Sequence, residues 1–104
     1  PDETLVGMAG FLAEGVRHLI DAFANLERHG GKDRGQAATD AADAAIKAQR
    51  QLERVYRKGM GSLLEVSDLR EVMGRRELYR RFSRLSEDIT EVAERVWYAS
   101  VKES

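Results

Sequence analysis

The chain has 104 residues, of which 34% are charged, and 17 Lys and Arg against 18 Asp and Glu give a formal net charge of −1. With one proline and 42% hydrophobic residues, the composition excludes a disordered chain and a strand-and-turn sandwich, and favours a single helical domain spanning residues 1–104. The absence of cysteine excludes disulfides, zinc–thiolate sites and thiol nucleophiles. The balanced charge argues against a nucleic-acid-binding domain, which is usually strongly basic.

The first predicted helix runs from Asp2 or Thr4 to His29. Its apolar residues recur at spacings of three and four, which is the signature of an amphipathic helix. They are Leu5, Met8, Leu12, Leu19, Phe23 and Leu26, with Val16 and Ile20 widening the stripe. Gly30 and Gly31 follow, and glycine readily takes the left-handed conformation that ends a helix.

The second predicted helix runs from Gly35 to Lys58 and is rich in alanine. Its apolar seam consists of Ala38, Ala41, Ala45, Ala48, Leu52 and Val55. Alanine is the best helix former and lets neighbouring backbones approach closely, but each alanine buries little area. We therefore expect a tight and shallow contact along this half of the helix, and a break at Gly59-Met60-Gly61.

A short helix holding Leu69, Val72 and Met73 is predicted next. Ser67 or Asp68 can cap it, and Asp68 with Glu71 three residues later is typical of a capping box. Two interpretations are open at Gly74: a kink or stop, or continuation into the third long helix. The second is possible because Arg75 and Arg76 at a helix start would oppose its dipole. The third helix extends to Val101. Its predicted seam is Leu78, Phe82, Leu85, Ile89, Val92, Val96 and Ala99.

These elements predict an all-α protein: an antiparallel three-helix bundle with a short extra helix between the second and third long helices. The core of so narrow a bundle is modest, so we expect self-association or packing against a further domain. No apolar run approaches the ~18–20 residues needed to cross a bilayer. No signal peptide is expected either, and the expected location is the cytoplasm.

Two carboxylates on the third helix are the first candidate site. Glu87 and Glu91 lie one turn apart on one face, and like charges at that spacing destabilise a helix unless something neutralises them. A hard cation held by carboxylates is one such neutraliser. The alternative is a solvated acidic face screened by Arg84 and Arg95, because exposed charged stripes are ordinary on helices.

The second helix offers another pair of oxygen ligands one turn apart, Gln49 and Glu53. Both pairs lie outside the predicted seams, so a metal held by Gln49, Glu53, Glu87 and Glu91 would sit on the bundle surface. Carboxylate and amide oxygens of this kind suit a hard cation.

The remaining polar residues give weaker indications of a functional site. The stripe Arg76, Arg80 and Arg84 could meet phosphates, but Glu77 and other acids neutralise the same stretch, so we expect no nucleic-acid partner. His18 near Glu14 is typical of a surface pair. There is no HExxH motif, no serine in a tight glycine-flanked turn and no phosphate-binding glycine loop, so we do not expect an enzyme.

Two segments resemble a known family. Residues 51–58, Gln-Leu-Glu-Arg-Val-Tyr-Arg-Lys, resemble the "EADRVYR" segment of PhoU-like phosphate transport regulators. Glu77-Leu78-Tyr79, followed by residues 86–93 and by Val101-Lys102, resembles their closing helix, "KELY…ATDRCEDVAN…LK". The order and separation of the segments also fit, and the resemblance covers essentially the whole chain.

The resemblance implies a fold, a site and a role. Members of the family contain two related three-helix bundles, and this chain resembles the second bundle, so it would be half of the usual architecture. Their E/D-x-x-x-D motifs bind multinuclear metal clusters on the bundle surface. The matching positions here are Gln49 with Glu53 and Glu87 with Glu91. Gln49 stands where the family has an acid, and both second acids are Glu where the family has Asp.

We therefore expect a PhoU-like, non-enzymatic regulator of phosphate uptake. It would act by contact with a phosphate transporter, or with the transporter's regulatory machinery, at the inner face of the membrane. Two alternatives follow from the missing bundle: the chain is a fragment of a two-bundle protein, or it pairs with itself as a homodimer that restores the bundle, and a homodimer is the expected oligomer. The alternative is a structural helical module that forms homo-oligomers without metal; its self-association would be indifferent to chelators and to Glu91→Ala.

Overall fold

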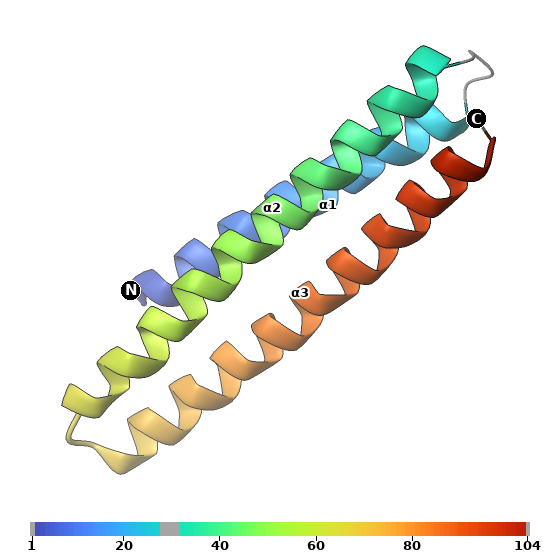
Figure 1. Cartoon of the computed structure of the whole chain (residues 1–104). Helices are drawn as coiled ribbons and strands as arrows, with labels where there is room; N and C mark the ends of the chain where they lie inside the picture. Colours follow the sequence, from blue (N-terminus) through green and yellow to red (C-terminus); the bar gives the residue numbers. More distant parts are fainter. Residues whose placement is uncertain (1, 28–31, 104) are drawn as a thin grey trace.

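A computed structural model describes residues 2–27 and 32–103 and shows a rod of three long helices with extents of 57 × 20 × 15 Å. They are α1 (Glu3–Glu27), α2 (Lys32–Ser62) and α3 (Leu69–Glu103), and a short 3-10 helix, η1 (Leu63–Glu65), follows α2. The chain runs up, down and up, so α1 and α3 are parallel to each other and antiparallel to α2 (Figure 1). The predicted three-helix bundle is confirmed.

Aspartate side chains cap the first turns of α1 and α3. The Oδ1 atom of Asp2 accepts hydrogen bonds from the backbone N–H groups of Thr4 (2.9 Å) and Leu5 (3.2 Å), which caps α1. Asp68 does the same for Arg70 (2.9 Å) and Glu71 (3.4 Å) at the start of α3. The Asp68 cap is therefore confirmed, although the segment that it begins is the first part of α3 and continues through Gly74 without a stop. The predicted end of the first helix at His29 lies outside the described residues.

The predicted break at Gly59-Met60-Gly61 is wrong, because α2 continues to Ser62. Gly59 is buried, and a Cβ atom there would overlap the side chain of Thr4. Glycine is present because α1 approaches α2 closely at this point, and packing offsets its poor helix propensity. The helix ends where the Ser62 hydroxyl donates to the Gly59 carbonyl oxygen (2.8 Å) and Val66 becomes extended.

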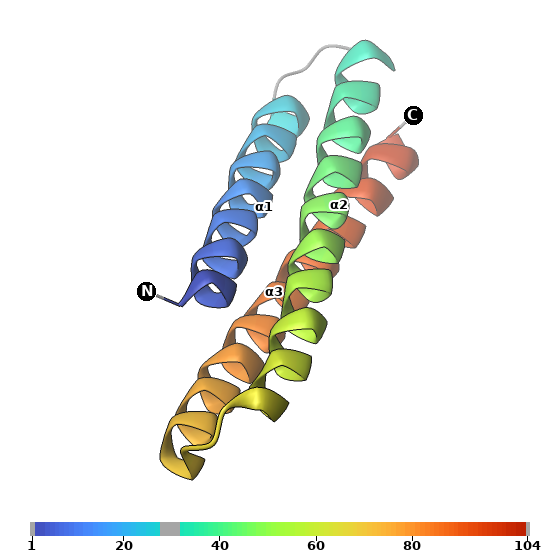
Figure 2. The same ribbon diagram turned by 90° about the vertical axis from the view of Figure 1, so that its left-hand side faces the viewer.

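The α2–α3 hairpin extends beyond the N-terminal end of α1, so its tip contains only two helices and η1 (Figures 1 and 2). Large apolar side chains there have no third helix to cover them. Leu64 is 90% exposed, and Leu69 and Met73 are also exposed.

The core has two parts. Toward the C-terminal ends of α1 and α3 it consists of small and medium side chains, including the α2 alanines: Leu19, Ala22, Ala38, Ala41, Ala42, Ala45, Ile89, Ala93 and Val96. Toward the hairpin it is built from Met8, Leu52, Leu63 and Tyr79. The shallow alanine contact predicted for α2 is confirmed, and a narrow core follows from it.

The predicted seam of α3 is wrong in part. Ile89 and Val96 are buried, but Leu78 is exposed and Leu85 is 52% exposed. The buried face of α3 instead includes three small polar side chains: Ser83, Ser86 and Ser100. Ser83 and Ser86 donate hydrogen bonds to Glu53 of α2, and Ser100 donates to the Gly35 carbonyl oxygen, so this polar face of α3 lies against α2. The helix is therefore rotated so that its leucines lie at the flank.

Candidate functional site

Gln49 and Glu53 lie in a polar layer between α2 and α3. The Glu53 carboxylate (Oε1) accepts hydrogen bonds from the hydroxyls of Ser83 (2.6 Å) and Ser86 (3.5 Å) and from the Gln49 amide (3.4 Å). The Gln49 amide also donates to the Ser86 hydroxyl (3.3 Å). Ser86 is fully buried, and Glu53 is partly buried. These contacts join α2 to α3, and they satisfy the polar groups of the layer.

Glu87 and Glu91 are exposed on α3 and face a different part of the surface. They line a surface groove of about 590 Å³ that does not include Gln49 or Glu53. The Glu91 carboxylate accepts a hydrogen bond from the Arg95 guanidinium (2.9 Å). Screening of the acidic face by Arg95, which was one of the two interpretations of this cluster, is present in the structure.

The four predicted metal ligands are not gathered at one point. Among residues 2–27 and 32–103, no group of three or more His, Asp or Glu side chains could hold a metal ion. Glu53 is occupied by serine hydroxyls, and Glu91 is paired with an arginine. Metal binding at Gln49, Glu53, Glu87 and Glu91 stays a prediction.

The basic and histidine candidates are surface groups. Arg75 and Arg81 pair with Glu71 (2.5 Å) and Glu77 (3.0 Å) one turn before them. The hydrogen bond from Arg81 lowers the pKa of Glu77. His18 lies 3.8 Å from the Glu14 carboxylate on the surface of α1. The charges of Arg80 and Arg84 also lower the pKa of Glu77, so this acid lies among the arginines of the stripe, as expected from the sequence.

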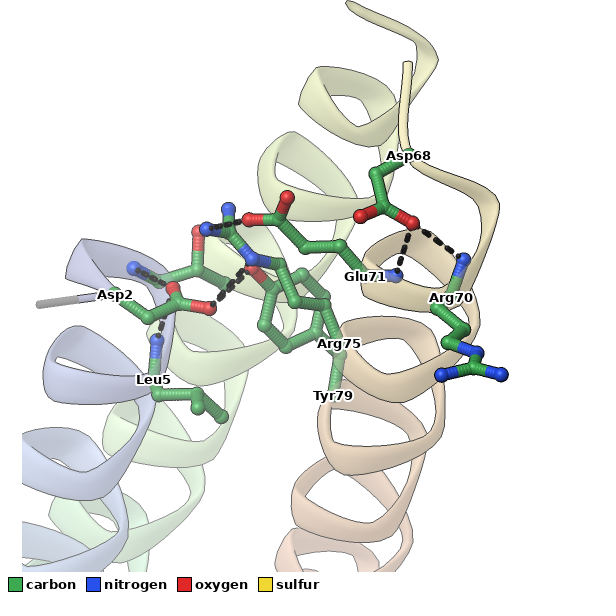
Figure 3. A network of polar contacts seen from close by, with 8 residues as sticks. Asp2, Leu5, Asp68, Arg70, Glu71, Arg75 and Tyr79 are labelled. Atoms are coloured by element: carbon green, nitrogen blue, oxygen red, sulfur yellow. Dashed lines mark hydrogen bonds and ion pairs between the residues drawn. The ribbon is translucent and has the colours of Figure 1, made fainter. Parts of the chain in front are cut away.

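A third polar cluster connects the start of α1 to α3 (Figure 3). The Tyr79 hydroxyl donates to the Asp2 carboxylate (2.7 Å), and the Arg75 guanidinium lies 3.9 Å from the same carboxylate. Tyr79 is 1% exposed, so its ring belongs to the core while its hydroxyl reaches the cap of α1. Sequence reasoning did not pair these residues, because they are 77 positions apart.

The pKa values of the two hydrogen-bonded groups of this cluster, Asp2 and Tyr79, are shifted in opposite directions. Burial raises the pKa of Asp2, but hydrogen bonds from Tyr79 and from two backbone N–H groups outweigh burial and leave this pKa below its ordinary value. Burial and the hydrogen bond to Asp2 raise the pKa of the Tyr79 phenol. Both shifts favour the pair as it stands at neutral pH, with Asp2 ionised and Tyr79 protonated.

One face of α1 is apolar and exposed. α1 carries a second row of apolar residues beside the row that enters the core, and every member of it is exposed. This α1 apolar stripe consists of Val6, Ala9, Ala13, Val16, Ile20 and Phe23. Phe23 was predicted to be part of the core seam, with Val16 and Ile20 widening it; in the structure Phe23 is 46% exposed and all three lie outside the core. The spacing of 3, 4, 3, 4 and 3 residues was the signal in the sequence.

Comparisons with known proteins give no assignment: no family model, no curated protein and no solved structure matches the chain. Across the part of the chain that the structure describes, none of the helices has the length and apolar character needed to cross a membrane.

Proposed function

We propose that this chain is a PhoU-like, non-enzymatic regulator of phosphate uptake that acts by contact with a phosphate transporter at the cytoplasmic face of the membrane. The proposal rests on the resemblance of residues 51–58 and of residues 77–79, 86–93 and 101–102 to that family, together with the three-helix fold that such members have. The observation that carries it is the packing of these two segments. Glu53, inside the first, accepts hydrogen bonds from Ser86, inside the second, and from Ser83, which lies between the matching parts of the second.

Action by contact agrees with what the surface offers. The polar clusters described above are caps, surface ion pairs and a layer between α2 and α3, all satisfied within the chain. Among the described residues, exposed apolar groups gather on the α1 apolar stripe and at the hairpin tip around Leu64, and the tip is the surface open to a transporter when a second copy covers the stripe. Exposed apolar groups of this extent are typical of protein interaction sites.

Phosphate uptake tests the regulatory role. Cells that lack the chain should take up labelled phosphate at an altered rate, and the wild-type chain should restore the rate. The transporter should also co-purify with the tagged chain from detergent-solubilised membranes. Unchanged uptake together with no co-purified phosphate transporter would refute the proposal.

The metal question is separate and is settled by metal content. If the predicted ligands hold iron or another transition metal, purified protein should contain it. Replacing Glu87 and Glu91 together by alanine should then remove it while helicity is retained. Protein that carries no metal after growth in metal-rich medium would remove the metal from the proposal and leave the contact role in place.

A second candidate function is a structural homo-oligomerisation module without metal. The exposed α1 apolar stripe favours it, and so does the dispersal of the four predicted ligands among the described residues. This candidate predicts tight self-association that a chelator and Glu91→Ala leave unchanged, with no effect of the chain on phosphate uptake.

A further inference from the structure

The α1 apolar stripe has the pattern of a helix–helix seam. Its six members repeat at alternating spacings of three and four residues from Val6 to Phe23 without a polar interruption. A sustained repeat of this kind places one apolar line along a helix and is what coiled-coil partners bury against each other. The core of this chain uses a different line of α1, which includes Met8, Leu19 and Ala22, so the bundle itself leaves the stripe uncovered.

The line of the stripe begins on the side of α1 that adjoins α3, because Asp2, one turn before Val6, accepts a hydrogen bond from Tyr79 of α3. A Cβ atom at Gly15 would lie 2.8 Å from the Ile89 side chain, which shows that α3 packs on α1 there. Leu85 is one turn before Ile89 on α3, and Leu78 is two further turns away on the same side. Leu85 is half exposed and Leu78 is exposed as well. The stripe and these two leucines therefore form one apolar face across two parallel helices.

We infer that a second copy of this chain covers this face, with the two α1 helices antiparallel about a two-fold axis that passes between residues 14 and 15. In that arrangement each small member of the stripe lies opposite a larger one. The layers are Val6 with Phe23, Ala9 with Ile20, and Ala13 with Val16, each pair occurring twice. A parallel pairing would instead place alanine against alanine and phenylalanine against phenylalanine, leaving voids at one end and crowding at the other.

The size of the face suits a dimer. From the exposed fractions of its side chains, the stripe with Leu78 and Leu85 presents on the order of 600 Å² of apolar surface per chain. A specific protein–protein interface takes about 600–1,000 Å² from each partner. A two-fold dimer uses the same patch on both copies, and the small-against-large layers make this patch complementary to itself.

The inference concerns self-association and does not depend on the regulatory role, which is tested by phosphate uptake. Sedimentation equilibrium of the purified chain should give the mass of two chains at micromolar concentration. Ile20→Asp should weaken the dimer at least ~100-fold, because each copy would bury an unpaired charge at the seam. Met73→Asp is the matched control: Met73 and Ile20 are each 64% exposed, but Met73 lies at the hairpin tip. A monomeric wild type, or an Ile20→Asp variant that stays dimeric, would overturn the inference.

Disulfide trapping tests the register and does not need the interface to be destroyed. The chain has no cysteine, so single variants report one position each. Ala9→Cys protein mixed with Ile20→Cys protein should form a mixed disulfide, because the two positions face each other. Either variant alone should stay uncross-linked, because its own copies are about 16 Å apart along the axis. Cross-linking of Ala9→Cys with itself, and none in the mixture, would overturn the antiparallel arrangement.

Discussion

A single hydroxyl, that of Tyr79, joins the N-terminal cap of α1 to α3. The substitution Tyr79→Phe removes this hydroxyl and leaves the ring in the core with Met8, Leu52 and Leu63. It therefore isolates the hydrogen bond of 2.7 Å to the Asp2 carboxylate from the packing of the aromatic ring.

The expected cost follows from the partners that Asp2 retains. A hydrogen bond to a charged group contributes about 1.5–3 kcal/mol to stability. Asp2 would still accept two backbone hydrogen bonds and lie 3.9 Å from Arg75, so we expect the lower end, about 1.5 kcal/mol. For a domain of this size, that loss corresponds to a decrease in Tm of roughly 8 °C. Asp2→Ala should cost about 2 kcal/mol, because it removes the helix cap as well.

Urea unfolding followed by circular dichroism at pH 7 measures both variants and the double variant. The double variant should be more stable than the sum of the two single losses predicts, by about 1.5 kcal/mol, because the hydrogen bond can be lost only once. Tyr98→Phe is the matched control, since it makes the same chemical change on an exposed ring and should leave stability unchanged. Additive losses, or a Tyr79→Phe variant as stable as the control, would refute the role given to this contact.

Three further predictions follow from the same structure. Acid should destabilise the chain as pH falls below about 4, because Asp2, whose pKa is lowered in the fold, contributes to stability only while its carboxylate is ionised. Urea unfolding midpoints measured from pH 7 to 2.5 should fall less steeply for Asp2→Asn than for the wild type. Equal slopes would contradict this prediction. Gly59→Ala should cost about 1–3 kcal/mol in urea unfolding, since its Cβ would overlap Thr4. Gly61→Ala, with open space around it, should instead gain up to about 1 kcal/mol, and a reversed order would contradict the packing. Glu27→Lys should tighten the dimer in sedimentation at low salt, because residue 27 faces Asp2 of the partner in the antiparallel register, whereas an unchanged or weaker dimer would count against that register.

Local chemistry was enough to predict much of the fold. The spacing of apolar residues identified three long helices, and Asp68 with Glu71 after it identified a helix start. The predicted stop at Gly59–Gly61 failed for a reason outside the segment. Glycine there accommodates Thr4 of a distant helix, and a propensity argument has no access to that contact.

The rotation of α3 about its own axis was not predictable from its apolar pattern. The pattern placed Leu78 and Leu85 in the core, but the face of α3 that meets α2 is the one whose serines hydrogen-bond to Gln49 and Glu53. Ser83 and Ser86 lie in the interface, and the leucines lie at the flank. The face that a helix buries depends on its partner, so neither sequence segment specifies it alone.

The rotation of α3 about its axis also determines where the two predicted metal ligands on this helix lie. The sequence correctly placed Gln49 with Glu53 on one face of α2, where an amide–carboxylate hydrogen bond joins them. It could not specify which face of α3 meets them. In the structure the serines meet Glu53, while Glu87 and Glu91 line a groove elsewhere on the surface.

Solution mass as a function of concentration, measured on one purified sample before and after treatment with a chelator, tests most directly the claim that this chain acts through apolar contact surfaces. We predict the mass of two chains in both conditions, because the α1 apolar stripe and not a metal would hold the copies together. A monomer at every concentration, or a dimer that dissociates when metal is removed, would contradict association through the α1 apolar stripe.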